Sequence, residues 1–199
     1  MIEWNGTVVA TTPRLLLRTF RREDLPAYAA LNADPAVVEF LGGEPLTHEY
    51  SDDIAAWANE VFDAEGIGLM AVERRADGAF LGMSGLHHLE AYPDDVEVGW
   101  RLAYEHWGQG YATEAANGWL EHAFGSMGLP RVISVTDPPN LRSLAVMHRL
   151  GMVYDHEAEI DDDGVRFDAV IHSLTADRFR QRVGEPPCDC LVTGPLAGR

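Results

Sequence analysis

Apolar residues recur along the chain with two different spacings, and each spacing predicts a different element. Between residues 51 and 64, and again between 115 and 127, they recur every three or four positions, as on one face of an α-helix. Gly128-Leu129-Pro130 then forms a typical helix end. Shorter runs rich in apolar, β-branched and aromatic residues predict strands over residues 14–20, 67–74, 80–89, 96–103, 132–135, 152–160 and 165–174.

Two more helices are predicted from their start signals. Asp24 precedes Leu25-Pro26 and is placed as the N-cap of a helix to about residue 32. Asn140 is placed to cap a second helix, which ends at Gly151. The order of the elements predicts a mixed α/β fold in a single domain over residues 1–183. From residue 184 the chain is rich in Pro and Gly, and we expect an irregular tail over 184–199.

The segment Trp107-Gly108-Gln109-Gly110-Tyr111-Ala112-Thr113 lies where a polar stretch meets the helix predicted at 115–127. Glycine lets a ligand approach the main chain closely. The first N–H groups of a helix have no partner within the helix, and the helix dipole favours an anion there. No charged residue occurs in this segment. It therefore predicts a phosphate cradle built from backbone groups.

Two common phosphate loops fit this segment poorly. A Walker A loop needs Gly-Lys-Ser/Thr, and the chain has no lysine, since all 15 of its Lys and Arg residues are arginine. The same absence excludes a lysine Schiff-base enzyme. A dinucleotide fingerprint needs a third Gly or Ala near the start of a βαβ unit. Thr113 stands there instead, and about a hundred residues precede the loop.

Composition narrows the class of protein and of ligand. With 199 residues, 46% of them hydrophobic, and no apolar run long enough to span a bilayer, we expect a globular domain outside membranes. The N-terminal residues lack a signal-peptide pattern, which favours a cytoplasmic protein. The net charge of −17 argues against nucleic acid as a ligand. It permits attraction of cationic partners, although solubility alone also explains it.

Two candidate metal sites are weak. Cys188 and Cys190 form a C-x-C pair in the predicted tail. Metal or redox roles stay open for them, but zinc sites need four ligands, so an incidental pair is favoured. His87 and His88 are neighbours in a predicted strand, so their side chains point to opposite faces. We therefore expect no bound metal.

Several segments together resemble the GNAT superfamily of N-acetyltransferases, and more narrowly the RimJ/RimL type. The resemblance covers roughly residues 12–180. It rests on the order and spacing of five motifs: Thr12-Pro13-Arg14-Leu15-Leu16-Leu17-Arg18, Glu97-Val98-Gly99-Trp100-Arg101-Leu102, Trp107 to Ala115, Asn140-x-x-Ser143 and Leu150-Gly151-Met152. It implies a mixed, mostly antiparallel central sheet flanked by helices, and transfer of an acetyl group from acetyl-CoA to a primary amine.

The resemblance also implies where acetyl-CoA binds. The family's loop has the form Gln/Arg-x-x-Gly-x-Gly/Ala, which Trp107 to Ala112 match with Trp in the first place. Backbone amides would hold the diphosphate, the end of the preceding strand would bond the pantetheine arm, and the next helix would contact that arm through Asn140. The implied cofactor-binding residues are Trp100, Arg101, Leu102, Trp107, Gly108, Gln109, Gly110, Tyr111, Ala112, Thr113 and Asn140. For Asn140, a plain N-cap is an equally good interpretation, compatible with binding.

Transfer to an amine needs a base and a proton donor. Glu97 resembles the strand glutamate that removes the amine proton in several family members, directly or through water. Its alternative role is to bond neighbouring backbone. Many members protonate the leaving thiolate with a Tyr seven residues after the Asn, but that position is Met147. The resemblance suggests Ser143 as the substitute, and His148 or water stays open.

The acceptor is not identified by any motif. The family builds its acceptor pocket from the first two helices and the last hairpin, here near the acidic turn Asp161-Asp162-Asp163. This turn and the overall charge favour a protein N-terminus or a small cationic amine, although a solvated turn has the same composition. The rival function is a non-catalytic acyl-CoA-binding sensor, which the missing Tyr favours. The oligomeric state stays open, a homodimer included.

Overall fold

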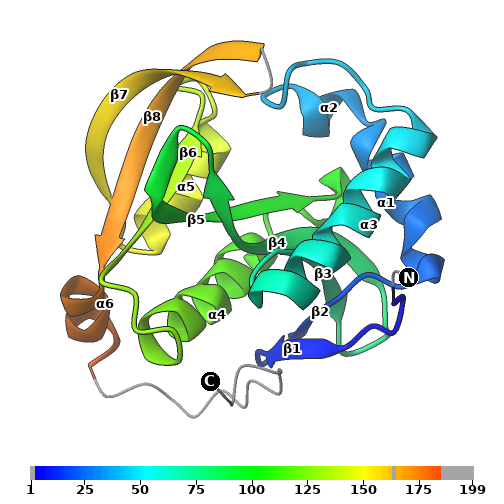
Figure 1. Ribbon diagram of the computed structural model, residues 1–199, viewed down its shortest axis with the longest axis horizontal. Coiled ribbons are helices and arrows are strands. Elements are labelled where there is room, and N and C mark those ends of the chain that lie inside the picture. The colour runs from blue at the N-terminus through cyan, green and yellow to red at the C-terminus, as the bar shows by residue number, and fades with distance from the viewer. Residues whose placement is uncertain (1–2, 163–164, 185–199) are drawn as a thin grey trace.

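The computed structural model describes residues 3–162 and 165–184 and forms one eight-stranded sheet (Figure 1). The strands lie in the order β1-β2-β3-β4-β5-β6-β8-β7. Their bounds are β1 Val8–Thr11, β2 Leu15–Arg18, β3 Leu69–Arg74, β4 Phe80–Leu89, β5 Tyr92–Leu102, β6 Arg131–Thr136, β7 Val153–Asp162 and β8 Val165–Thr175. All paired neighbours among these described strands are antiparallel except β5 and β6. The predicted mixed, mostly antiparallel sheet is confirmed.

Helices cover both faces of the sheet. They are η1 Arg22–Asp24, α1 Leu25–Asn32, α2 Pro35–Val38, α3 His48–Glu65, η2 Tyr104–His106, α4 Tyr111–Gly125, α5 Leu141–Arg149 and α6 Ala176–Val183. Gly118 of α4 lies against Leu17 of β2, so α4 covers the sheet face that carries Leu17. Tyr28 of α1 donates a hydrogen bond to the sulfur of Met83 on β4, so α1 covers the other face. Figure 1 shows α1 and α3 side by side, far from the β7–β8 hairpin.

The ladder pairs align two arginines in one row across the sheet. Arg18 on β2 lies opposite Ala71 on β3, Ala71 opposite Met83 on β4, and Met83 opposite Arg101 on β5. Directly opposed residues in a sheet project from the same face, and here it is the face under α1. We call these four residues the arginine row. Since neighbouring strands lie about 4.8 Å apart, its ends are roughly 14 Å from one another.

The sheet divides between β5 and β6. These strands run parallel, and their ladder holds a single residue pair, Glu97 with Ile133. Beyond that pair β5 continues to Leu102 and β6 to Thr136 without pairing to one another. Both chains then turn into helices, α4 after β5 and α5 after β6. The C-terminal ends of adjacent parallel strands, where helices begin, are a common position for ligand sites in α/β proteins.

Several predictions need correction. The strand predicted over residues 14–20 is β2, and β1, α2 and α6 were not predicted. The helix predicted at 51–64 begins at His48, because Thr47 caps it by accepting the Tyr50 N–H. Asp24 precedes α1 but makes no side-chain cap, because its carboxylate binds Arg18 instead.

The predicted acidic turn is only partly described. Asp161 and Asp162 belong to β7, and Arg166 donates a hydrogen bond of 3.1 Å to the Asp161 carboxylate. Asp163, Gly164 and most of the predicted tail, with Cys188 and Cys190, lie outside the described residues.

Candidate active site

The glycine segment forms the start of α4. Gly108 and Gly110 have φ of +72° and +80°, which an L side chain rarely adopts, so glycine is required at both. Gly110 is the N-cap of α4 and offers no side-chain cap. The first-turn amides of α4 therefore have neither an intrahelical partner nor a capping side chain. A Cβ on Gly108 would meet nothing within 4 Å, so its backbone faces open space. The predicted anion cradle has the required backbone geometry.

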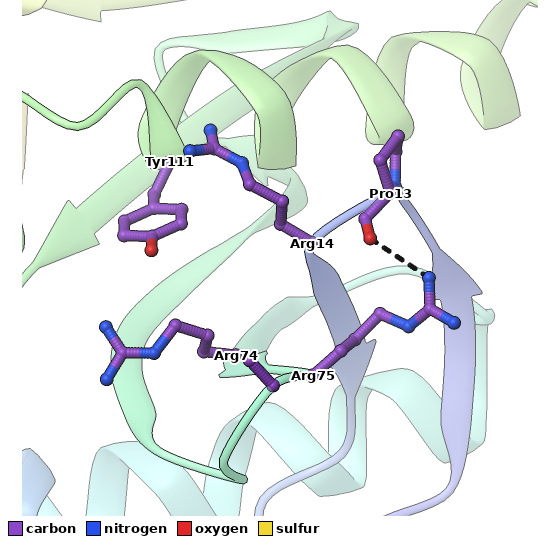
Figure 2. A pocket seen from close by; sticks show the side chains of 6 residues that line it. Pro13, Arg14, Arg74, Arg75 and Tyr111 are labelled. Atoms are coloured by element: carbon purple, nitrogen blue, oxygen red, sulfur yellow. Dashed lines mark hydrogen bonds between the residues drawn. The ribbon is translucent and has the colours of Figure 1, made fainter.

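Arg14 fixes this loop in place, a role the sequence motif did not reveal. Its guanidinium donates to the Gln109 carbonyl at 3.0 Å and pairs with Glu114 at 2.6 Å. It also lies 4.4 Å from the centre of the Tyr111 ring. Figure 2 shows Arg14 and Tyr111 beside Arg74 and Arg75 around a pocket of about 390 Å³. Hydrogen bonds hold the loop from the β1–β2 connection.

Trp107 joins the two sides of the division between β5 and β6. Its indole N–H donates to the Leu102 carbonyl at 2.7 Å, so it closes back onto the end of β5. The guanidinium of Arg142, on the first turn of α5, lies 4.8 Å from the centre of the Trp107 ring. The starts of α4 and α5 therefore lie close together beyond the strand ends. Two helix N-termini there favour negative charge.

Asn140 caps α5, as predicted. Its Oδ1 accepts the Ser143 N–H at 3.1 Å, and its Nδ2 donates to the Thr136 hydroxyl at 3.0 Å. The Ser143 hydroxyl forms no hydrogen bond with the described residues and is partly exposed. Met147, one turn later, is fully buried, whereas His148 is exposed. Ser143 thus keeps a hydroxyl available near the strand ends.

Glu97 occupies the point where β5 and β6 separate. Its side chain is 9% exposed, and one carboxylate oxygen accepts the Val135 N–H of β6 at 2.9 Å. The other oxygen lies 3.3 Å from Nε2 of His87, the residue opposite Glu97 on β4. Glu97 therefore bonds neighbouring backbone, as its alternative role requires, while its role as the base stays a prediction for a carboxylate held beside the His87 ring. The pairing with His87 was not predicted, although the β4–β5 register carries it.

Arg101 and its neighbours complete β5. The hydroxyl of Ser84 donates to the Gly99 carbonyl at 2.9 Å. Arg101 projects toward α1, where it donates to the Asn32 side-chain carbonyl at 2.7 Å. Trp100 and Leu102 alternate with it and so project to the face covered by α4. Trp100 is partly buried and Leu102 is buried. The predicted cofactor-binding residues of β5 thus divide between the two faces.

Within residues 3–162 and 165–184, no group of three or more His, Cys, Asp or Glu side chains could hold a metal ion. No described helix is both long and apolar enough to cross a membrane.

Comparison with known proteins agrees with this architecture. A family model described as an acetyltransferase (GNAT) domain matches residues 14–153. The FsC-acetyl coenzyme A-N(2)-transacetylase of Aspergillus fumigatus is 28% identical over 181 residues, which cover 84% of this chain and 76% of that protein.

Two solved structures show the same fold. A GNAT-family acetyltransferase from Bacillus anthracis superposes with a TM-score of 0.74 at 22% identity, covering 84% of this chain and 98% of that one. A RimL ribosomal L7/L12 α-N-protein acetyltransferase superposes with a TM-score of 0.71 at 14% identity, covering 85% and 94%.

Proposed function

The chain belongs to the GNAT acetyltransferase family and is an N-acetyltransferase, and from this premise we propose that it transfers the acetyl group of acetyl-CoA directly to a primary amine of an acceptor bound next to Glu97. The observation that carries the proposal is the joint position of three features. The division between β5 and β6 is surrounded by the start of α4, the Glu97 carboxylate and the Ser143 hydroxyl. The helix has no side-chain cap, the carboxylate is held by a backbone N–H, and the hydroxyl forms no hydrogen bond with the described residues.

Acetyl-CoA fits the residues present. The first-turn amides of α4 and the left-handed glycines suit a diphosphate, which needs close approach to backbone N–H groups. The part of β5 that does not pair with β6, up to Leu102, offers backbone groups to the amide-containing pantetheine arm. Asn140 keeps a second Nδ2 hydrogen for this arm while it caps α5.

Glu97 acts as the base in the proposed transfer. An amine is mostly ammonium near neutral pH, so a proton must leave before the nitrogen attacks the thioester carbon. The Glu97 carboxylate takes that proton directly or through one water, while the Val135 N–H holds its orientation. Nitrogen–carbon bond formation gives a tetrahedral oxyanion, which a backbone N–H of β5 can stabilise. The carbon–sulfur bond then breaks, and the nitrogen releases its second proton as the amide forms. The thiolate takes up a proton from the Ser143 hydroxyl or a water, which is reprotonated by the proton that the nitrogen releases.

An acyl-CoA-binding sensor is the alternative function. The observation that favours it is Met147, which is fully buried and cannot donate a proton where many relatives carry Tyr. A sensor would use the same glycine loop but would have no need of a fixed carboxylate. The position of Glu97 therefore favours the enzyme.

We propose the acceptor class from similarity to named proteins alone. The named relatives act, by their descriptions, on the N(2) position of FsC and on the α-amino group of a ribosomal protein. We propose a RimJ/RimL-type acceptor of this kind, a primary amine of a small molecule or a protein N-terminus. The Asp161–Arg166 hydrogen bond reduces the charge available for steering cations from the β7–β8 hairpin.

The test is release of free CoA thiol from acetyl-CoA in the presence of a panel of amines. The panel contains amino acids, ω-amino acids, peptides, polyamines and aminoglycosides. Gly110→Val serves as the control, because a β-branched residue resists a φ of +80° and would block the diphosphate. Amine-dependent thiol release that this variant lacks supports the enzyme. Tight acetyl-CoA binding without release for any amine supports the sensor.

A further inference from the structure

Arg101 is a partly buried cation that the protein itself leaves without a counter-ion. Its Nη1 donates to the neutral amide of Asn32, and its Nε is buried with no hydrogen-bond acceptor. No carboxylate of the described residues lies within ion-pair distance of it. Burial lowers the pKa of Arg101, although an arginine stays protonated near neutral pH. An unsatisfied charged donor of this kind costs stability unless something else satisfies it.

Helix α1 shows that the counter-ion is missing at a position where the fold could supply one. Asp24, Tyr28 and Asn32 are spaced four residues apart and share one side of η1 and α1. Along the arginine row, Asp24 pairs with Arg18, Tyr28 contacts Met83 and Asn32 contacts Arg101. An Asp at 32 would pair with Arg101 in the same way. The chain carries 32 acidic residues, so the amide is not explained by a shortage of carboxylates.

Arg101 shares its face of β5 with Glu97, the proposed base. Residues 97, 99 and 101 alternate with those facing α4, and the middle one is glycine, so β5 places no side chain between the two charges. The side chains of His87 and Leu69 border this position from β4 and β3. Four residues of strand separate their Cα atoms by about 13 Å. After a hydrogen bond of about 3 Å at each end, a molecule that contacts both side chains spans roughly 7 Å.

The diphosphate of acetyl-CoA is a poor candidate for this counter-ion. The glycine loop leads into α4, which covers the face that carries Leu17 and Leu102. Arg101 projects to the opposite face, under α1. An anion held by the first turn of α4 and an anion held by Arg101 would therefore lie on different sides of β5.

We propose that Arg101 binds a carboxylate of the acceptor, so that the enzyme selects amines that also carry an acid group several bonds away. This deepens the proposed function and rests on it. The planar guanidinium matches a carboxylate through two parallel N–H···O bonds. With Nη1 held by Asn32, Nε and Nη2 remain to donate to the two oxygens of a ligand carboxylate. An ω-amino acid of about six carbons, or a short peptide with a free C-terminus, has the required span.

The experiment compares 6-aminohexanoate with 6-aminohexanamide as acceptors. The two differ only in the charge at the far end. We expect kcat/KM for the acid to exceed that for the amide by at least tenfold, through KM. In Arg101→Met this ratio should fall to near 1, while the Kd for acetyl-CoA stays within about twofold. Arg180→Met, at an exposed arginine of α6, is the matched control and should keep the ratio.

Asn32→Asp provides a second variant that keeps Arg101 in place. Asn32 Nδ2 donates to the Ser51 hydroxyl oxygen at 2.7 Å, and in the variant this hydroxyl can donate to the new carboxylate instead. The carboxylate would also pair with the Arg101 guanidinium, as a ligand would. We expect an unchanged or higher melting temperature together with loss of the acid–amide preference. A merely structural Arg101 would give the higher stability with the preference intact.

Three results would overturn the proposal. They are equal activity on acid and amide in the wild type, a ratio that survives both variants, and loss of acetyl-CoA affinity in Arg101→Met, which would assign the anion to the cofactor. If acetyl-CoA binds but no amine of the wider panel is acetylated, the proposed function itself fails. Acetylation restricted to amines without an acid group leaves that function standing and refutes the carboxylate site.

Discussion

The two ends of the arginine row hold the same side chain on the same face of one sheet, yet they are built differently. Arg18 is 1% exposed and binds Asp24 through two hydrogen bonds and Glu73 through one. Although burial alone would lower it, Asp24 and Glu73 raise the pKa of Arg18 above its ordinary value. Burial lowers the pKa of Arg101, whose polar neighbours include Tyr28 and Asn32. One end is closed by the protein, and the other is left for a ligand.

The difference shows how a single face can serve both folding and binding. At the closed end, each nitrogen of the arginine side chain has an acceptor within the protein, from Thr19, η1 or β3. Removing that arginine would leave Asp24 without its ion-pair partner and Glu73 with Arg21 alone. At the other end the partner is an amide, and the sheet divides one strand further on. The positive charge of Arg101, which the fold leaves without a counter-ion, is therefore available to bind a ligand.

The largest expected effect belongs to the closed end. Arg18→Met leaves Asp24 and Glu73 without their shared cation, and breaking a buried ion pair from one side costs about 3–5 kcal/mol. Chemical denaturation should show this loss, whereas the exposed Arg180→Met should change the unfolding free energy within error. Near wild-type stability for Arg18→Met would mean that the closed end is not structural.

Glu97→Gln tests the chemistry at the divided part of the sheet. The Gln side-chain oxygen can still accept the Val135 N–H, so the fold should hold. Loss of the base should lower kcat about 100-fold with little change in acetyl-CoA affinity. The deficit should shrink at alkaline pH, where more amine is already neutral. Steady-state kinetics from pH 7 to 10 measure it, and normal turnover would show that the base lies elsewhere.

Arg14→Ala should have a moderate effect that is confined to the cofactor. Losing the hydrogen bond to the Gln109 carbonyl loosens the loop before α4, and we expect acetyl-CoA to bind roughly 2- to 10-fold more weakly. Arg75→Ala is the matched control, since Arg75 lines the same pocket but bonds the Thr12 and Pro13 carbonyls. Calorimetric titration separates the two. Equal losses for both variants would assign the effect to the pocket's charge.

A comparison of His122 with Arg101 shows whether the lack of a hydrogen-bond partner is enough to identify a ligand site. It is 2% exposed on α4, neither ring nitrogen has a hydrogen-bond partner, and burial lowers its pKa. Its ring packs edge-on against the buried Trp119, so nothing points to a ligand. Arg101 differs because it is partly exposed and shares its face of β5 with the proposed base.

The pH dependence of stability follows from this burial. The unfolded chain binds more protons than the folded one below the ordinary His pKa of about 6.5. The contribution of His122 is therefore complete above pH 6.5 and is lost as pH falls below it, by at most about 1.4 kcal/mol per pH unit. His172, whose pKa is also lowered by burial, contributes to the same pH dependence of the unfolding free energy. His122→Phe should remove the part of this slope that His122 contributes and leave the part that His172 contributes. An identical slope in this variant would contradict the assignment.

Features that depend on neighbouring residues can be predicted from the sequence better than contacts between residues that are far apart in the chain. The helix start at the glycine segment, the Asn140 cap and the two strands of the last hairpin depend on neighbouring residues, and their patterns predicted them correctly. Asp24 has the pattern of an N-cap, but a buried arginine competes for its carboxylate, which no local rule detects.

The site was predicted in its parts but not in its connections. The Glu97 carboxylate was expected on a strand, but its bond to Val135 depends on where two parallel strands separate. Arg14 and Glu114 lie a hundred residues apart in the chain and meet only after folding. The missing counter-ion of Arg101 depends on the register of four strands and of α1. Periodicity assigns a residue to a face, but it does not identify what lies opposite.

The most direct test of the central claim measures stability and activity together on the two arginine variants. Arg18→Met and Arg101→Met are each assayed for unfolding free energy and for kcat/KM with 6-aminohexanoate, normalised to folded protein. We predict opposite outcomes: Arg18→Met loses stability and keeps its activity per folded molecule, and Arg101→Met keeps its stability and loses at least tenfold in kcat/KM. If both variants lose only stability, or both lose only kcat/KM, the two ends of the arginine row have the same role. The assignment of one end to folding and the other to ligand binding is then wrong.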